Sequence, residues 1–205
     1  MIRPSQKTKT ESRTQAQRER ILTAAQACFV QKGFHAASMA TIAETAGMSP
    51  GLIYRYFENK NAIILAIIEQ QLEVVRHKIR QLRASSDLAE GIMEHFDEHD
   101  TGSSNSMSSA LFLEMSAEAT RDPQIAAALQ RFDDTVRNEL VEWLGRSEQR
   151  GGHGLPAGVA RERVLMLLCL LEGLKVRRAR EPGLDRKLLR RSLDFVIEAL
   201  FPPLR

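Results

Sequence analysis

The 205-residue chain lacks the features that mark several large classes of protein. It has two cysteines, which is too few for a disulfide framework. Its longest apolar run, residues 164–171, is much shorter than a membrane span, and its polar first 18 residues have no apolar core for a secretory signal. No stretch alternates apolar and polar residues as a half-buried strand would. These absences predict a cytoplasmic, all-α protein that makes no membrane contact.

The two cysteines, Cys28 and Cys169, each stand alone within an apolar run. We expect both as small buried side chains, and a disulfide between them is the alternative. Hydrophobic residues make up 43% of the chain, which is enough for a proper core.

Charge is unevenly distributed, although the formal net charge is only +3. Residues 1–60 hold nine Lys or Arg against four Asp or Glu, whereas residues 87–148 hold four against fourteen. Residues 161–191 are basic again, with ten against four. The basic first segment suits a polyanionic partner, although a solvated surface would give the same count.

The spacing of apolar residues predicts about nine helices. We expect them over residues 14–32, 38–46, 50–57, 60–83, 86–99, 106–119, 123–149, 157–180 and 184–200. Glycine, proline and serine mark the breaks between them. Residues 1–13 are polar and basic, and we expect them to form a flexible arm, either disordered or adding contacts to DNA.

The sequence AGMSPGLIYRYFENK, residues 46–60, stops and restarts a helix twice. Gly47 ends one helix, and Ser49 and Pro50 start the next as N-cap and first helical residue. Two short helices joined by a tight turn form a helix-turn-helix, whose second helix enters the major groove of DNA. Lys60 then lies in the first turn of the following helix, where it opposes the helix dipole. A phosphate beside it would remove that cost, although a solvated lysine is the alternative.

The segment SMATIAETAGMSPGLIYRYFENKNAII, residues 38–64, resembles the DNA-binding segment of the TetR family of transcriptional regulators. RERILTAAQACFVQKGFHAAS, residues 18–38, resembles the first helix of that family. The resemblance covers about residues 15–70. It implies an all-helical homodimer with a three-helix DNA-binding domain, here residues 14–59. A larger domain for effector binding and dimerisation, here residues 60–205, would follow.

The resemblance also implies which residues contact DNA. Tyr54, Tyr56 and Lys60 would contact phosphates, and Arg55 is the candidate for reading a base, most naturally guanine. Ala40 stands where some family members carry a longer polar residue, which weakens the case for base contacts from the second helix. The full predicted set is Ser38, Met39, Ala40, Thr41, Ser49, Pro50, Gly51, Leu52, Tyr54, Arg55, Tyr56 and Lys60.

Two further surfaces are predicted in the larger domain. Residues 157–180 are apolar nearly all round, so a four-helix bundle with a second copy is expected. The predicted dimer residues are Leu167, Leu171, Leu174, Leu189, Leu193, Val196 and Leu200. An apolar effector cavity is expected among Leu72, Phe112, Met115, Glu118, Phe132, Val136 and Trp143. A lipophilic cation would be favoured if Glu114 or Glu118 faced inward, and a neutral or fatty ligand is the alternative.

The chain is therefore interpreted as a repressor that binds a near-palindromic double-stranded DNA operator as a homodimer and is released by a small molecule. An activator of the same fold is an alternative, because the outcome depends on operator position. His95 and His99 lie one helical turn apart among carboxylates, so a helical metal-dependent enzyme is an alternative of another class. The sequence lacks the Glu-x-x-His order of zinc hydrolases and a phosphate-binding glycine loop. We therefore predict no enzymatic activity, no metal and no cofactor.

Overall fold

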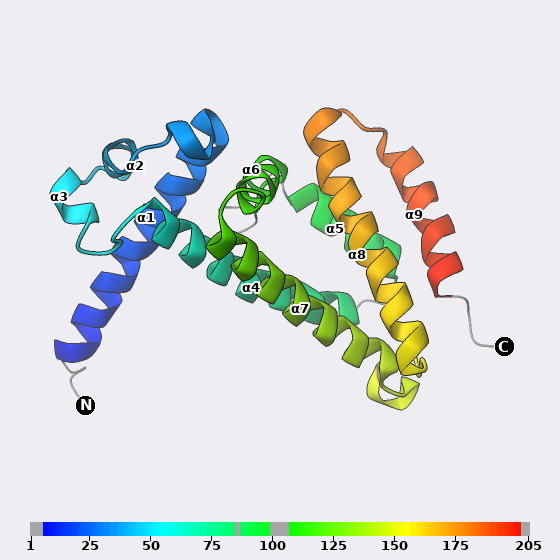
Figure 1. Cartoon of the computed structure of the whole chain (residues 1–205). Coiled ribbons are helices and arrows are strands. Elements are labelled where there is room, and N and C mark those ends of the chain that lie inside the picture. The colour runs from blue at the N-terminus through cyan, green and yellow to red at the C-terminus, as the bar shows by residue number, and fades with distance from the viewer. Residues whose placement is uncertain (1–5, 85–86, 99–106, 202–205) are drawn as a thin grey trace. The chain divides into compact units, whose positions relative to one another are not determined.

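The computed structural model describes residues 6–84, 87–98 and 107–201, and over these ranges the chain forms nine α-helices, one 3-10 turn and no strand. The all-α prediction is thereby confirmed (Figure 1). The helices are α1 (Gln6–Ala36), α2 (Met39–Thr45), α3 (Pro50–Ile53), α4 (Lys60–Ala84), α5 (Leu88–Glu98), α6 (Ser109–Ala119), α7 (Pro123–Gly145), α8 (Ala157–Arg180) and α9 (Arg186–Leu200).

Several helix boundaries differ from those predicted, among them the end of α7 at Gly145 rather than at residue 149. α1 begins at Gln6 and so takes in part of the expected arm, while residues 1–5 lie outside the described ranges. The residues at its start are polar and carry no apolar periodicity, so the spacing of apolar residues gave no sign of a helix there. α3 has only four residues, and the chain turns from Tyr54 onward. Gly33 breaks α1 as expected, with a φ of 75° that favours glycine.

The contacts divide the chain into two compact units, which are described separately. Unit 1 comprises Met1–Glu69 and Leu113–Ala128, and unit 2 comprises Gln70–Phe112 and Leu129–Arg205. The boundary falls inside α4, α6 and α7, so each of these helices contributes residues to both units. The division of function at residues 59 and 60 remains a prediction.

The core of unit 1 joins α1, α2 and α3. Ile42 and Ala43 of α2 and Ile53 of α3 are fully buried, and Phe57 after α3 is nearly so. From α1, the residues buried in the same unit are Ile21, Leu22, Ala24, Ala25, Cys28 and Phe29. The apolar spacing of α1 and of the helix pair therefore points inward as the sequence predicted.

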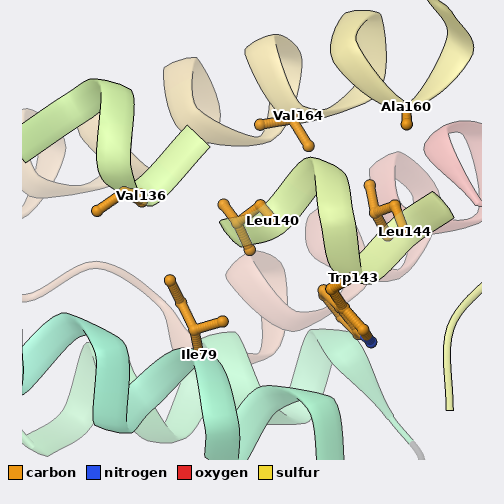
Figure 2. Packing of buried hydrophobic residues seen from close by; sticks show 7 residues of the cluster. All are labelled: Ile79, Val136, Leu140, Trp143, Leu144, Ala160 and Val164. Atoms are coloured by element: carbon orange, nitrogen blue, oxygen red, sulfur yellow. The ribbon is translucent and has the colours of Figure 1, made fainter. Parts of the chain in front are cut away.

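Unit 2 holds two apolar clusters. One joins α4, α7 and α8 through Ile79, Val136, Leu140, Trp143, Leu144, Ala160 and Val164 (Figure 2). The other joins α5, α8 and α9 through Ala89, Ile92, Met93, Leu167, Leu189 and Leu193. Trp143 also donates a hydrogen bond of 2.9 Å from Nε1 to the carbonyl oxygen of Gly151, which satisfies the polar atom of a buried indole.

Both cysteines are free, so they form no disulfide. Cys28 is buried as predicted, whereas Cys169 is exposed on α8, which corrects the second half of that prediction. Its apolar neighbours in sequence surround α8 on all sides, so the run alone could not show which side faces solvent. In the described part of the chain, no helix is both long and apolar enough to cross a membrane.

Candidate nucleic-acid interface

The turn between α2 and α3 is built as a helix-turn-helix. Ser38 caps α2, because its Oγ accepts a 3.1 Å hydrogen bond from the backbone N–H of Thr41. Gly47 has a φ of 61°, and its N–H donates to the carbonyl oxygen of Glu44 at 2.9 Å. A Cβ on Gly47 would lie 2.5 Å from Nη2 of Arg20. The positive φ therefore favours glycine at this turn, and a side chain there would also displace the flexible guanidinium of Arg20.

None of the twelve predicted DNA contacts is buried. Tyr54 and Arg55 are exposed, and Tyr56 and Lys60 are partly buried. Ser49 occupies the N-cap position of α3 but makes no side-chain cap hydrogen bond. The structure thus places the predicted residues on the accessible surface of the helix-turn-helix, and their contacts with DNA remain a prediction.

Gly51 is an exposed residue of α3 whose identity the protein itself does not explain. A Cβ added there would meet no atom within 4 Å, and the residue has no positive φ. Glycine inside a helix costs about 0.5–1 kcal/mol relative to alanine. If this backbone lay against DNA, the close approach would account for a glycine at this position.

Arg18 supports the tyrosine segment, and it was not predicted from the sequence. Its Nη1 donates a 3.1 Å hydrogen bond to the carbonyl oxygen of Tyr56. Its guanidinium carbon lies 4.4 Å from the centroid of the Phe57 ring. Nothing in the spacing of Arg18 marks this contact, because its partners lie 38 and 39 residues later in the chain.

Lys60 has a partner inside the protein. Its Nζ donates to the carbonyl oxygen of Phe34 and, at 3.3 Å, to that of His35, and it lies 4.2 Å from the centroid of the Phe34 ring. Burial lowers the pKa of Lys60, and the nearby carboxylate of Glu118 opposes that shift. The C-terminal carbonyls of α1 therefore offset the unfavourable position of Lys60 in α4. A phosphate is no longer needed to explain a lysine at this position, although the phosphate contact remains a prediction.

Glu114 and Glu118 of α6 also contact the end of α1. Oε2 of Glu114 accepts a 3.0 Å hydrogen bond from the backbone N–H of Phe34. Oε2 of Glu118 lies 3.2 Å from Nε2 of His35, and the Glu118 side chain is only 7% exposed. We call this set the α1–α6 junction, and its members are Phe34, His35, Lys60, Glu114 and Glu118.

The junction changes the interpretation of both carboxylates. From the sequence, Glu118 was predicted to line the effector cavity, with Glu114 as its alternative. The structure instead brings both to α1 within unit 1, whereas Phe132 and Val136 belong to unit 2. The physical reason is the break at Gly33, which leaves the N–H of Phe34 without a helical acceptor.

The junction supplies a stability prediction. Glu114→Ala should lower the free energy of unfolding by about 1–3 kcal/mol, because the N–H of Phe34 would have no acceptor. For a chain of this size, each kcal/mol corresponds to a fall of about 2–4 °C in Tm. Thermal unfolding and hydrogen exchange at the Phe34 amide measure the effect. Glu114→Gln keeps an acceptor oxygen and should lower the free energy of unfolding only slightly. Glu198→Ala, at an exposed residue of α9, is the control and should also have little effect on stability. Equal destabilisation by Glu114→Ala and Glu114→Gln would contradict the assigned hydrogen bond.

Unit 2 contains a pocket of about 190 Å³ among α4, α5, α7 and α8. Its walls are mainly aliphatic, with Lys78, Gln81 and Glu94 as the polar members. Of the residues predicted for the effector cavity, Val136 lines it, and Leu72 and Phe132 pack against the adjoining cluster. Trp143 is buried in that same cluster, whereas Met115 is buried in unit 1. Phe112 lies in unit 2 against Lys175.

The predicted dimer residues divide into two groups. Leu167, Leu189 and Leu193 are buried in the core of their own protomer, so the structure assigns them to that core instead. Leu171, Leu174, Val196 and Leu200 are partly buried. The large apolar side chains exposed in unit 2 are Leu165, Met166, Leu188 and Phe195. We call these four residues the exposed α8–α9 face. Helices apolar on more than one side do not reveal from sequence which side packs internally.

The alternative based on His95 and His99 lies outside what the structure describes. Residue 99 is not described, and neither is the side chain of residue 95. Within the described residues, no group of three or more His, Cys, Asp or Glu side chains could hold a metal ion.

Two short helices joined by a tight turn and exposed in this way are typical of DNA-binding regulatory proteins. Residues 21–67 match the family model "Bacterial regulatory proteins, tetR family", and residues 86–202 match "BetI-type transcriptional repressor, C-terminal". The chain belongs to the TetR family of transcriptional regulators.

Three known proteins illustrate the similarity. The transcriptional regulator UidR of Escherichia coli is 35% identical over 147 residues, covering 69% of this chain and 71% of UidR. The transcriptional repressor AcnR of Corynebacterium jeikeium is 29% identical over 184 residues, covering 89% and 91%. The structure of Salmonella enterica GusR superposes with a TM-score of 0.73 at 28% identity, covering 91% of this chain and 95% of GusR.

Proposed function

We propose that this protein is a transcriptional repressor that binds a near-palindromic operator as a homodimer and is released by a small-molecule effector. The observation that carries the proposal is the exposed segment from Ser49 to Tyr56, which includes a glycine that the protein itself does not require. Similarity to AcnR, a transcriptional repressor, over 89% of this chain supports repression rather than activation. An activator of the same fold is the alternative. The protein would act in the bacterial cytoplasm, where its DNA is, and no catalytic residue is proposed.

The homodimer is proposed to form through the exposed α8–α9 face. Large apolar side chains exposed on two neighbouring helices favour a protein partner. Packing α8 and α9 against the same helices of a second copy would bury them in a four-helix bundle. Two recognition helices would then enter successive major grooves of the operator.

The effector is proposed to shift the equilibrium between two conformations of the dimer, one with high and one with low affinity for DNA. A ligand in the unit 2 pocket releases DNA only if it binds the conformation with low DNA affinity more tightly than the other. α4, α6 and α7 contribute to both units, so they are the proposed route of coupling. The α1–α6 junction is where that route would reach the DNA-binding helices. Glu118→Gln should therefore alter the response to effector more than it alters effector binding.

Two substitutions should separate the proposed roles in DNA binding. Arg55→Ala should relax the preference at one base pair by about 1–3 kcal/mol, because a base contact carries specificity. Lys60→Ala should weaken binding to all DNA sequences alike. It should also reduce the slope of log affinity against log salt concentration by about one for each phosphate contact that is lost. Fluorescence anisotropy at several salt concentrations measures both, and thermal unfolding checks that the protein stays folded without the Lys60 contacts to α1. A sequence-specific effect of Lys60→Ala would contradict its assignment to phosphate.

The proposal as a whole depends on specific DNA binding. Selection of bound fragments from genomic DNA should enrich one near-palindromic site, and the purified protein should shift that site in a gel. If no fragment is enriched and the protein shifts no DNA under any salt condition, the proposed function is wrong.

A further inference from the structure

Two arginines of α1 contact the backbone on either side of α3. Nη1 of Arg18 donates a 3.1 Å hydrogen bond to the carbonyl oxygen of Tyr56, three residues after α3 ends. Nη2 of Arg20 donates at 3.4 Å to the carbonyl oxygen of Gly47, three residues before α3 begins. Residues two apart in a helix do not face the same way, so the two arginines reach separate points.

α3 has little of its own to fix its direction. It is a single turn of four residues, and its N-cap Ser49 makes no side-chain cap hydrogen bond. One turn is too short to be stable alone, because helix nucleation orders several residues for each hydrogen bond gained. Its buried apolar anchors are Ile53 and, just beyond its end, Phe57. Apolar burial is non-directional, so the direction of the two ends of α3 depends on polar contacts.

The candidate base-reading residue, Arg55, depends on one of these contacts. It lies in the turn of residues 54–56, which follows α3. Carbonyl groups beyond the end of a helix have no helical donor, and Arg18 supplies one to the carbonyl of Tyr56. The guanidinium carbon of Arg18 also lies 4.4 Å from the centroid of the Phe57 ring. Arg18 thereby joins the turn that carries Arg55 to a buried anchor of unit 1.

We infer that Arg18 and Arg20 are positioning residues for operator recognition, which hold the two ends of α3 in the direction that base contacts require. Base contacts depend on hydrogen-bond geometry in the groove, whereas non-specific binding depends on positive charge near phosphates. A loosened α3 would therefore lose specific contacts first. The role of the two arginines in recognition rests on the proposed function, in which α3 enters the major groove.

Arg18→Met and Arg20→Met test the inference, because each removes a donor and keeps much of the side-chain bulk. In fluorescence anisotropy, Arg18→Met should lower affinity for the selected operator by about tenfold or more, and for unrelated DNA by about twofold or less. Arg20→Met should have a smaller effect of the same kind, because its hydrogen bond is longer. Arg161→Met, at an exposed arginine of α8 in unit 2, is the control for the loss of one charge and should leave both affinities unchanged.

The salt dependence separates positioning from a direct contact with DNA. A positioning residue neutralises no phosphate, so Arg18→Met should keep the wild-type slope of log affinity against log salt concentration. Equal loss of affinity for operator and unrelated DNA, with a slope reduced by about one, would show that Arg18 contacts a phosphate and would overturn the inference.

Hydrogen exchange of the free protein tests the contacts without DNA. The backbone amides of Arg55, Tyr56 and Phe57 donate to carbonyls of α3. In Arg18→Met they should exchange faster by about tenfold, while the amides of residues 21–29 of α1 stay as protected as in the wild type. Faster exchange of both sets alike would show a general loss of stability and would contradict a positioning role.

The inference and the proposed function can fail separately. A wild-type protein that shifts no DNA contradicts the proposed function, and the exchange rates still show whether Arg18 holds the segment after α3. A wild-type protein that binds its operator specifically, with Arg18→Met binding it equally well, leaves the proposed function intact and overturns the inference.

Discussion

Replacing Phe195 with aspartate should dissociate the proposed homodimer and lower operator affinity by about a hundredfold or more. Phe195 lies on α9 and is 75% exposed, although it is one of the largest apolar side chains in the chain. In the proposed bundle it would be buried against the second copy, where an unpaired carboxylate is strongly unfavourable. A monomer would then bind one half-site at a time, without the gain from joining two binding events.

Sedimentation velocity should show the wild type as a dimer and Phe195→Asp as a folded monomer at micromolar concentration. Val30→Asp is the matched control, because Val30 is an exposed apolar residue of α1 in unit 1. It should leave the dimer intact. Leu171 is a poorer choice, since it is partly buried, lines the pocket and packs on the core of its own protomer. A Phe195→Asp protein that remains dimeric would show that the exposed α8–α9 face is not the interface.

Gly51→Glu should reduce binding to operator and to unrelated DNA alike, by about a hundredfold or more, because it places a negative charge against the phosphates. No atom of the protein lies within 4 Å of the new Cβ, so folding should be unchanged. Gly51→Ala adds bulk without charge. It should weaken binding less, and Tm should stay the same or rise slightly.

Gly183→Glu is the control for the change in net charge. Gly183 also has open space around it, but it lies in unit 2 between α8 and α9. Anisotropy titrations should show full DNA affinity for this variant, and circular dichroism should show all three glycine variants folded. If Gly51→Glu binds DNA as tightly as Gly183→Glu, α3 does not approach DNA closely and the proposed mode of recognition is wrong.

Local patterns revealed the helices and the helix-turn-helix. Ile42 and Ile53, predicted to pack the two short helices together, are both fully buried, and Gly47 marks the turn between them with its positive φ. Each of these signals depends on residues within a few positions of one another. The start of α1 was missed because its polar residues carry no apolar periodicity.

Contacts between residues far apart in the sequence could not be predicted from local patterns. Glu114 binds the backbone of Phe34 across 80 residues, and Lys60 reaches the same turn across 26. A glutamate on a helix looks the same in sequence whether it faces a ligand, water or a broken helix. The same holds for the leucines of α8 and α9, where Leu167 is in the core while Leu165 is exposed.

The sequence by itself determined that this chain is an all-helical member of the TetR family with a helix-turn-helix near its start, because periodicity, caps and turn glycines are encoded locally. Only the tertiary structure decided which apolar side of α8 and α9 remains exposed, that Glu114 and Glu118 contact the end of α1, and which residues line the pocket of unit 2. Those outcomes depend on which surfaces meet once the helices pack. Burial and charge pairing are set by neighbours in space, which one helix's sequence does not specify.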